Sequence, residues 1–190
     1  MCASSIIGGM RDSRLIQLRT PDTVKALDLI SHSAEQTQQL GALLAPLLRA
    51  GDVVCLEGSL GAGKTCLTQG IGRGLGVSVP MTSPTFVIVH EYALPSRTFR
   101  LYHIDLYRIQ STAEACATGL EDYFFGDGIC VIEWADRIVD ILPGDRLWIT
   151  LRYVSDSQRS VLLQGHGLRY VELLQQLRGR LHNASAGLMG

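Results

Sequence analysis

The chain has 190 residues, 46% of them hydrophobic, and a formal net charge of −1 at pH 7. This length and composition fit one domain with a sizeable core, and the near-neutral charge excludes a protein that holds nucleic acid through an overall basic excess. No apolar run approaches the ~18 residues of a membrane span, residues 1–14 lack the signal-peptide pattern, and the five cysteines form no C-x-x-C pair, so we expect a cytoplasmic protein that binds no membrane.

The first predicted elements lie before residue 50. An apolar-rich segment over residues 24–31 predicts an edge strand. Ser33 with Gln36 three residues later forms a capping box, which marks the start of a helix. Leucines at helical spacing follow, and Pro46 is expected to kink or end that helix.

Residues 58–65 read G-x-x-x-x-G-K-T, the P-loop pattern that binds nucleotide phosphates. The apolar run over residues 53–56 predicts a buried strand before it, and a helical pattern follows it. Gly61 and Gly63 allow the backbone to curl so that its amides point inward toward an anion. Lys64 is predicted to reach the β- and γ-phosphates, and the Thr65 hydroxyl to ligate Mg²⁺.

The helix predicted after Lys64 is unusual because Gly70, Gly72 and Gly74 lie in its later turns. Each glycine costs about 1 kcal/mol relative to alanine in a helix. The helix therefore either packs closely on a neighbour or is soft, and the sequence leaves both possibilities open. Gly76 is predicted to be the C-cap.

The remaining elements are shorter. Strands predicted over 86–92 and 99–105 form an antiparallel hairpin. The other predicted elements are a helix over 112–119, an apolar strand over 129–134, a helix over 136–141, a hairpin of 147–154 with 160–164, and a helix over 170–177. Helices interleaved with strands predict an α/β P-loop NTPase fold, with a central, mostly parallel sheet flanked by antiparallel edge strands and helices.

The predicted domain organisation has three parts. Residues 1–20 show little periodicity and are predicted to be a poorly ordered leader. Residues 21–180 are predicted to form a single P-loop ATPase domain. Residues 181–190 are predicted to be a flexible tail.

Two carboxylates stand where a P-loop protein needs one near Mg²⁺, at the ends of apolar strands. Glu133 ends the most apolar strand of the chain, and Asp105 ends the alternating strand before it. Both are predicted to act with Lys64 in catalysis. His103 lies two residues before Asp105, so it shares a strand face with that acid, and its pattern favours a core or pairing histidine over a catalytic one.

The base is predicted to be adenine. Guanine-specific P-loop proteins usually carry an Asn- or Thr-Lys-x-Asp signature, but the single asparagine here is Asn183, and the one lysine outside the P-loop, Lys25, follows Val24. Asp105 is also not followed by glycine three residues later, as it would be in a GTPase switch. ATP is therefore favoured over GTP.

The sequence leaves two possible roles open for Ser83 and Thr85, and two for Trp134. Ser83 and Thr85 either sense a γ-phosphate or cap a turn, and Trp134 either belongs to the site or simply packs.

Four motifs occur together in the chain. They are the P-loop in its Leu-Gly-Ala-Gly-Lys-Thr form, Ser83-Pro84-Thr85-Phe86, Tyr102-His103-Ile104-Asp105-Leu106-Tyr107-Arg108, and Ile132-Glu133-Trp134. In this order and spacing they resemble the TsaE (YjeE) ATPases, over roughly residues 30–165. That family helps to make threonylcarbamoyladenosine beside the anticodon of tRNAs that read codons beginning with A, together with TsaD, TsaB and the threonylcarbamoyl-AMP synthase. The resemblance implies a Mg²⁺-dependent ATPase of low intrinsic turnover that a partner stimulates and that meets tRNA only through the TsaB–TsaD complex.

The resemblance also implies roles for individual residues. Thr65 and Glu133 would hold Mg²⁺, and Asp105 would support hydrolysis. Trp134 with Ser83, Pro84 and Thr85 would form a nucleotide-sensitive surface that faces a partner. The predicted nucleotide-binding residues are Thr37, Ser59, Leu60, Gly61, Ala62, Gly63, Lys64, Thr65, Cys66 and Arg159. One departure is Ser59, where the family commonly has an acid.

Two other functions stay open beside the ATPase. A small-molecule P-loop kinase would need an acceptor pocket and usually an arginine-bearing lid, and Arg97 and Arg100 are too sparse to form one. A nucleotide-binding interaction module with negligible turnover would fit the glycine-rich helix and Ser59.

Overall fold

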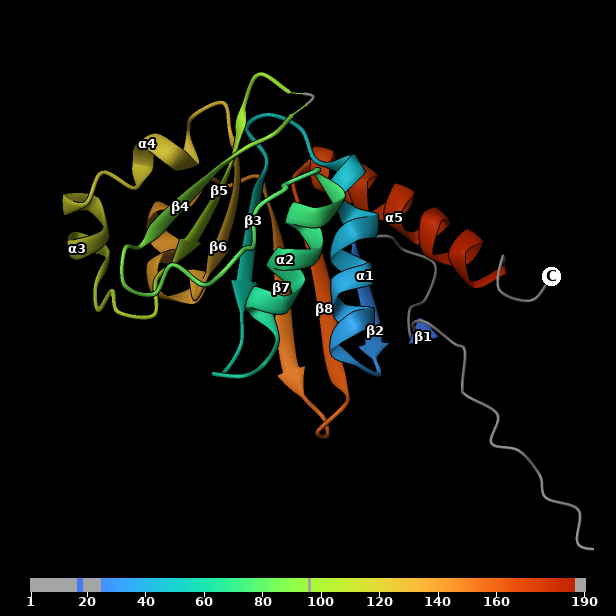
Figure 1. Ribbon diagram of the computed structural model, residues 1–190. Helices are drawn as coiled ribbons and strands as arrows, with labels where there is room; N and C mark the ends of the chain where they lie inside the picture. The colour runs from blue at the N-terminus through green and yellow to red at the C-terminus, as the bar shows by residue number, and fades with distance from the viewer. Residues whose placement is uncertain (1–16, 19–24, 96, 187–190) are drawn as a thin grey trace, which may run out of the picture.

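A computed structural model describes residues 17–18, 25–95 and 97–186. Within these residues the strands form one eight-stranded sheet in the order β1-β2-β8-β7-β3-β6-β5-β4 (Figure 1). The strands are β1 (Gln17–Leu18), β2 (Ala26–Ser31), β3 (Val53–Glu57), β4 (Val89–Ala93), β5 (Arg100–Asp105), β6 (Ile129–Glu133), β7 (Arg146–Tyr153) and β8 (Arg159–His166). The helices are α1 (Ala34–Leu44), α2 (Lys64–Gly74), α3 (Thr112–Ala117), α4 (Glu121–Phe124) and α5 (Leu168–Ala186), with 3₁₀ helices η1 (Ala45–Leu47) and η2 (Ala135–Ile141).

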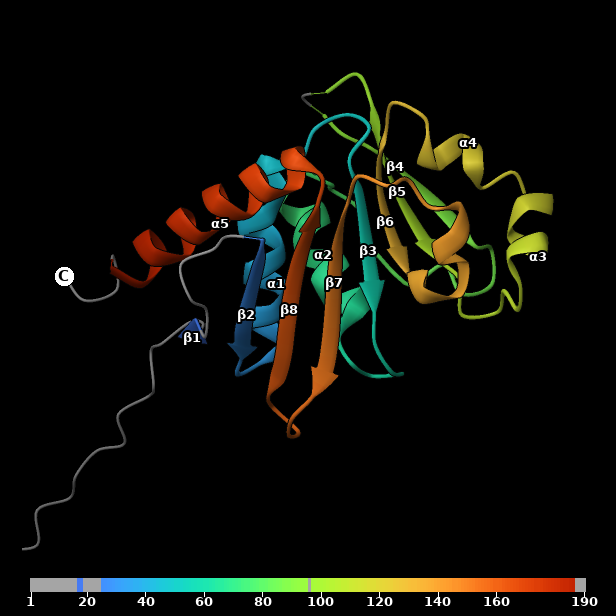
Figure 2. The same ribbon diagram turned by 180° about the vertical axis from the view of Figure 1, so that it is seen from behind.

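The centre of the sheet is parallel and its edges are antiparallel, as the same strands seen from behind illustrate (Figure 2). β3 pairs in parallel with β6 and β7, and β5 pairs in parallel with β6. β1, β2, β8 and β4 each join their neighbours antiparallel. The predicted α/β fold with a mostly parallel centre is therefore confirmed. The parallel centre brings the carboxyl ends of β3, β5 and β6 to one edge of the sheet.

Two hydrophobic cores lie on the two faces of the sheet, and β3 shows the division most clearly. Val54 and Leu56 pack into a core shared with α1, α2 and α5. Val53 and Cys55 pack into the other core, shared with α3, α4 and η2. Successive strand residues point to opposite faces, so the continuous apolar run of β3 is what a strand covered on both sides requires.

Helix α1 begins as the capping pattern predicts. The Ser33 side chain accepts a hydrogen bond from the Gln36 amide at 3.2 Å, and the Gln36 side chain accepts one from the His32 amide at 2.8 Å. The second bond reaches one residue further back than in a standard capping box. The helix gives way to the 3₁₀ turn η1 at Ala45, because Pro46 cannot continue the α-helical hydrogen bonds.

The glycines of α2 answer the question that the sequence leaves open: α1 and α2 pack backbone against backbone. A Cβ atom on Gly70 would collide with the Gln38 carbonyl of α1, and one on Gly74 would lie 2.8 Å from the Ala42 carbonyl oxygen. Gly41 on α1 is equally enclosed, since its Cβ would lie 2.7 Å from the amide nitrogen of Ile71. The glycines lower the helical propensity of α2, but they allow its backbone to approach that of α1 closely.

Three predictions about the elements differ from the structure: one strand boundary, the position of one strand in the sheet, and one missed helix. Residues 86–88 form a turn rather than the start of a strand, because the Pro84 carbonyl accepts the amides of both Val87 and Ile88, and Ile88 has a positive φ of 69°. β2 is not an edge strand, since β1 pairs with its outer side. Helix α4 was missed because its four residues are too few for a periodic pattern.

The two ends of the chain also differ from expectation. Most of the predicted leader, residues 1–20, lies outside the described residues, and its described part includes β1. Helix α5 continues to Ala186 and so enters the predicted tail over 181–190, of which residues 187–190 lie outside the described part. None of the described helices has both the length and the apolarity to cross a membrane.

Candidate functional site

The P-loop has the backbone geometry that its glycines predict. Gly58, Gly61 and Gly63 have positive φ values of 149°, 75° and 103°, and Gly63 is the N-cap of α2. Side-chain-bearing residues rarely adopt these angles, so glycine is needed at these turns. The loop therefore ends at the positive dipole end of α2, which favours bound phosphate.

Lys64 lies inside this loop and is only 5% exposed. Its ammonium donates hydrogen bonds to the carbonyls of Gly58 at 2.6 Å and Ser59 at 3.0 Å, and it stands 3.8 Å from the centroid of the Trp134 ring. Burial lowers the pKa of this ammonium, and the nearby carboxylates of Glu133 and Asp105 oppose that shift. The buried cation is thus compensated by carbonyls, an aromatic face and two acids.

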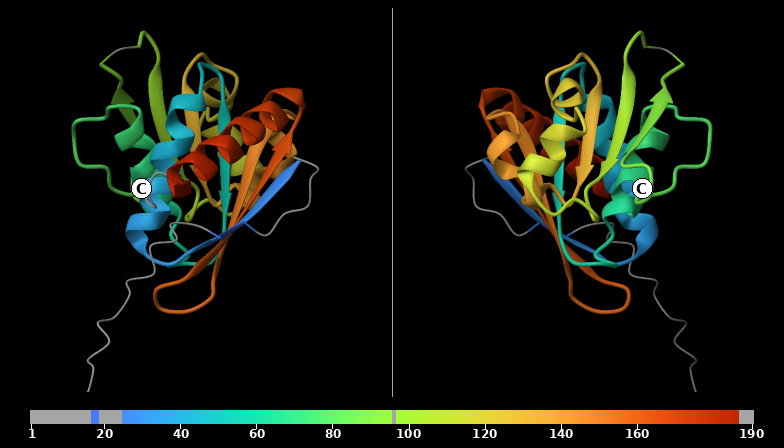
Figure 3. Two further views of the ribbon diagram at one scale, coloured as in Figure 1. Left: turned by 90° about the vertical axis from the view of Figure 1, so that its right-hand side faces the viewer. Right: turned by 90° about the vertical axis from the view of Figure 1, so that its left-hand side faces the viewer.

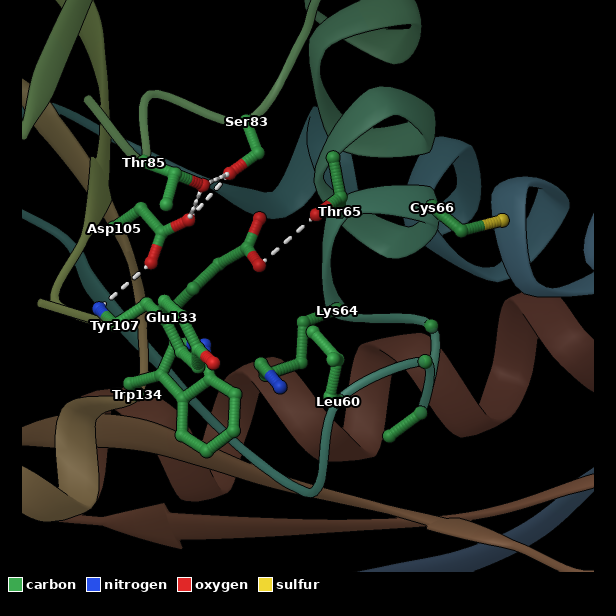
Figure 4. A pocket seen from close by; sticks show the side chains of 13 residues that line it. Leu60, Lys64, Thr65, Cys66, Ser83, Thr85, Asp105, Tyr107, Glu133 and Trp134 are labelled. Atoms are coloured by element: carbon green, nitrogen blue, oxygen red, sulfur yellow. Dashed lines mark hydrogen bonds between the residues drawn. The ribbon is translucent and has the colours of Figure 1, made fainter. Parts of the chain in front are cut away.

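Glu133, at the end of β6, connects the P-loop helix to the neighbouring strand. Its Oε2 accepts a hydrogen bond from the Thr65 hydroxyl at 3.0 Å, and its Oε1 lies 2.7 Å from Nε2 of His103. The carboxylate is only 3% exposed. Figure 4 shows the Thr65 hydroxyl and the Glu133 carboxylate pointing at each other across the pocket.

Asp105, at the end of β5, is held by donors from two directions. Its Oδ2 accepts hydrogen bonds from the hydroxyls of Ser83 and, at 2.8 Å, Thr85, and its Oδ1 accepts the Tyr107 amide at 2.9 Å. The register of the parallel strands pairs Asp105 with Glu133. The two predicted acids are therefore neighbours, and the Ser83–Thr85 segment is tied to one of them (Figure 4).

An aromatic wall closes the side of the pocket beyond the acids. The rings of Tyr107 and Trp134 have centroids 5.2 Å apart. Trp134 has a φ of 61°, which strains a residue with a bulky side chain by about 1–2 kcal/mol. Arg137 contacts both aromatic residues and holds the loop after β5. Its guanidinium donates to the carbonyls of Tyr107 at 2.5 Å and Ile109 at 2.6 Å, and it lies 5.4 Å from the centroid of the Trp134 ring.

These groups surround one cavity of about 400 Å³. The residues that line it are Leu60, Gly61, Ala62, Gly63, Lys64, Thr65, Cys66, Ser83, Thr85, Asp105, Tyr107, Glu133 and Trp134. Its oxygen donors suit Mg²⁺, which prefers carboxylate and hydroxyl oxygen. Among the described residues, no group of three or more His, Cys, Asp or Glu side chains could hold a metal ion.

Comparisons with known proteins identify the family. A family model described as "Threonylcarbamoyl adenosine biosynthesis protein TsaE" matches residues 31–161. The chain belongs to the TsaE family. The TsaE of Bacillus subtilis is 40% identical over 157 residues, which cover 81% of this chain and 95% of that protein. The TsaE of Treponema pallidum is 39% identical over 132 residues, which cover 70% of this chain and 96% of that protein.

A solved structure agrees with the TsaE assignment. The crystal structure of Bacillus subtilis YdiB has a TM-score of 0.71 to this chain at 36% sequence identity. The alignment covers 86% of this chain and 99% of that one. The P-loop fold predicted from the sequence is thus shared over nearly the whole of a related protein.

Four residues predicted for the TsaE site do not line the cavity: Thr37, Ser59, Pro84 and Arg159. Thr37 is 2% exposed, and its hydroxyl lies 2.8 Å from that of Ser31, so it belongs to the region around the start of α1. Arg159 contacts the P-loop, where its Nη2 donates to the Gly61 carbonyl at 3.3 Å. The β7–β8 hairpin that carries Arg159 extends past the rest of the sheet (Figure 3).

Cys66 lines the cavity but has a different environment from the acids. Its thiol donates to the Ala34 carbonyl at 3.1 Å and points toward α1, away from Glu133 (Figure 4). Burial raises the pKa of this thiol, so it stays protonated near neutral pH.

Two residues were not predicted: Tyr107, which lines the cavity, and Arg137, which contacts the residues beside it. Tyr107 lies in the motif over residues 102–108, and its position two residues after Asp105 could have identified it from the sequence. Arg137 gives no such signal, because its contacts join the loop after β5 to η2, which follows β6.

Proposed function

We propose that this chain is a Mg²⁺-dependent ATPase that acts on a TsaB–TsaD complex during the formation of threonylcarbamoyladenosine in tRNA. The observation that carries the proposal is the convergence of Lys64, Thr65, Glu133 and Asp105 on one cavity at the carboxyl ends of parallel strands. Membership of the TsaE family supports the pathway.

Each residue has a chemical task in this proposal. The amides of residues 58–65 and the Lys64 ammonium bind the phosphates, and Thr65 and Glu133 are the oxygen ligands that would hold Mg²⁺. Bound Mg²⁺ supplies positive charge to the phosphate oxygens. Asp105 orients the attacking water, because its three hydrogen bonds fix both of its oxygens.

The absence of arginine among the residues that line the cavity supports a low intrinsic turnover. An arginine that reaches the transferring phosphate is worth about 10³–10⁵ in rate in other P-loop enzymes. Arg159, which approaches the loop, is occupied by the Gly61 carbonyl and by the carbonyls of Ser155 and Gln158 at 2.7 Å and 2.9 Å. A partner that supplies or frees a cation would therefore stimulate hydrolysis.

Loss of the protein should lower threonylcarbamoyladenosine in bulk tRNA, as measured by nucleoside mass spectrometry. Wild-type protein should restore it, and the Lys64→Ala form should not, because the pathway needs the nucleotide cycle. Isolated protein should bind tRNA only weakly at physiological salt, since its net charge is −1. Normal modification in a clean deletion would refute the proposal. Transfer of ³²P to small metabolites rather than to water would favour the kinase.

The two acids should fail in different ways. Glu133→Gln should weaken Mg²⁺-dependent nucleotide binding, because a neutral amide is a poorer ligand for a hard cation. Asp105→Asn should lower kcat by about 10²–10⁴ while ATP affinity stays within a few-fold, because its contribution is made mainly in the transition state. Steady-state hydrolysis and calorimetry separate the two effects.

A matched control is Asp140→Asn, which removes an exposed carboxylate on η2 outside the cavity. It should leave both quantities unchanged. Wild-type hydrolysis in both Glu133→Gln and Asp105→Asn would show that the catalytic acid lies elsewhere.

A further inference from the structure

One buried polar residue beside the site has no role in the mechanism above. His103 lies on β5 and is 0% exposed. Its Nε2 stands 2.7 Å from Oε1 of Glu133. Burying an imidazole costs free energy unless it is hydrogen-bonded, and a leucine or isoleucine would fill a strand position in this core without that cost. The contact with Glu133 is therefore what the histidine adds.

The other ring nitrogen fixes the direction of this hydrogen bond. Nδ1 of His103 is buried and has no hydrogen-bond partner among the described residues. A proton on Nδ1 would leave a buried N–H unsatisfied, at a cost of about 1–3 kcal/mol. The arrangement that avoids this cost places the proton on Nε2, which donates to the Glu133 carboxylate.

The two oxygens of Glu133 are then held by two different elements. Oε2 accepts from Thr65 on α2, at 3.0 Å, and Oε1 accepts from His103 on β5. Glutamate has three rotatable bonds, and Thr65 is itself a candidate metal ligand whose hydroxyl changes partner when it binds metal. His103 would then be the contact that keeps the carboxylate in place when Thr65 is a metal ligand.

We propose that His103 is a positioning residue that sets the orientation of the Glu133 carboxylate for the metal–nucleotide complex. This inference rests on the proposed function, because it assigns His103 a task in the same Mg²⁺ site. Groups that hydrogen-bond to a metal ligand typically change metal affinity by about 10- to 100-fold when removed.

The test compares three substitutions with wild type. His103→Leu keeps the volume and removes the donor, His103→Gln keeps an N–H near the position of Nε2, and His103→Asn has the same amide on a shorter side chain. Calorimetry with a non-hydrolysable ATP analogue, at a series of Mg²⁺ concentrations and in EDTA, gives the half-saturating Mg²⁺ concentration and the metal-free nucleotide affinity for each.

His103→Leu and His103→Asn should raise the half-saturating Mg²⁺ concentration by about 10- to 100-fold and leave the metal-free affinity within about twofold of wild type. His103→Gln should restore most of the loss. The control His90→Leu, on β4 in register with His103 but hydrogen-bonded to Tyr92, should behave as wild type.

The possible results distinguish failure of the proposed ATPase function from failure of the role of His103. A wild-type protein that does not bind the analogue refutes the proposed ATPase, whatever the variants do. A wild type that binds, with His103→Leu at the wild-type Mg²⁺ requirement, overturns the role of His103 alone. If thermal melting shows that His103→Leu does not fold, the pair His103→Gln and His103→Asn decides, and equal Mg²⁺ requirements in these two overturn the inference.

Discussion

Replacement of Lys64 by alanine is expected to weaken ATP binding by about 10- to 100-fold and to reduce hydrolysis below detection. Hydrogen bonds to a charged group contribute about 1.5–3 kcal/mol, which corresponds to that range of affinity. The loss cannot be made up locally, because the only other lysine of the chain, Lys25, is exposed near the start of β2, and the described cavity is lined by no arginine.

The measurement is calorimetric titration with ATP, followed by phosphate release under single-turnover conditions. Lys25→Ala is the matched control, since it makes the same change at the other lysine and should leave both quantities unaltered. Lys64→Arg should also bind poorly, because a planar guanidinium does not replace a compact ammonium inside a tight loop. Unchanged affinity and hydrolysis in Lys64→Ala would contradict the assignment of residues 58–65 as a phosphate-binding loop.

Gly70→Ala is expected to destabilise the fold by about 3 kcal/mol, although alanine is the better helix former. The added Cβ would collide with the Gln38 carbonyl of α1, so the two helices would have to separate. Separation weakens the contacts of Leu40, Leu44 and Leu67, which are fully buried in the core beside these helices. A loss of this size is a large part of the 5–15 kcal/mol that typically stabilises a domain.

Gly179→Ala on α5 is the control, because a Cβ at that position would meet no heavy atom within 4 Å. It should raise the free energy of unfolding by about 0.5–1 kcal/mol through helical propensity alone. Denaturant midpoints of the two variants therefore move in opposite directions. A Gly70→Ala protein as stable as wild type would mean that α1 and α2 do not touch through their backbones.

The parts of the molecule that the sequence predicted are those set by local patterns. The P-loop spacing determines the turn at Gly61 and Gly63, and the apolar runs before Asp105 and Glu133 place both acids at one edge of the sheet. A strand that ends in an acid can be recognised from the pattern of apolar and polar residues along the sequence alone.

The parts that the sequence did not predict depend on contacts between distant segments. The α2 glycines are ambiguous until α1 is placed against them. The turn at Ile88 depends on both its own positive φ and the Asp105 amide, which donates to the Ile88 carbonyl at 2.9 Å. Thr37 is predicted to bind nucleotide, and the structure shows that it is 2% exposed on a helix that packs on α2.

The close approach of α1 and α2 has a mechanical consequence for the nucleotide site. Side chains can change rotamer to absorb a displacement, but a contact made by Gly41, Gly70 and Gly74 has no side chains to rearrange. We therefore expect the two helices to move as one rigid unit. Helix α2 begins at Lys64, the lysine of the phosphate-binding loop. We expect a displacement of α1 to move α2, and with it the start of the phosphate-binding loop, as a rigid body.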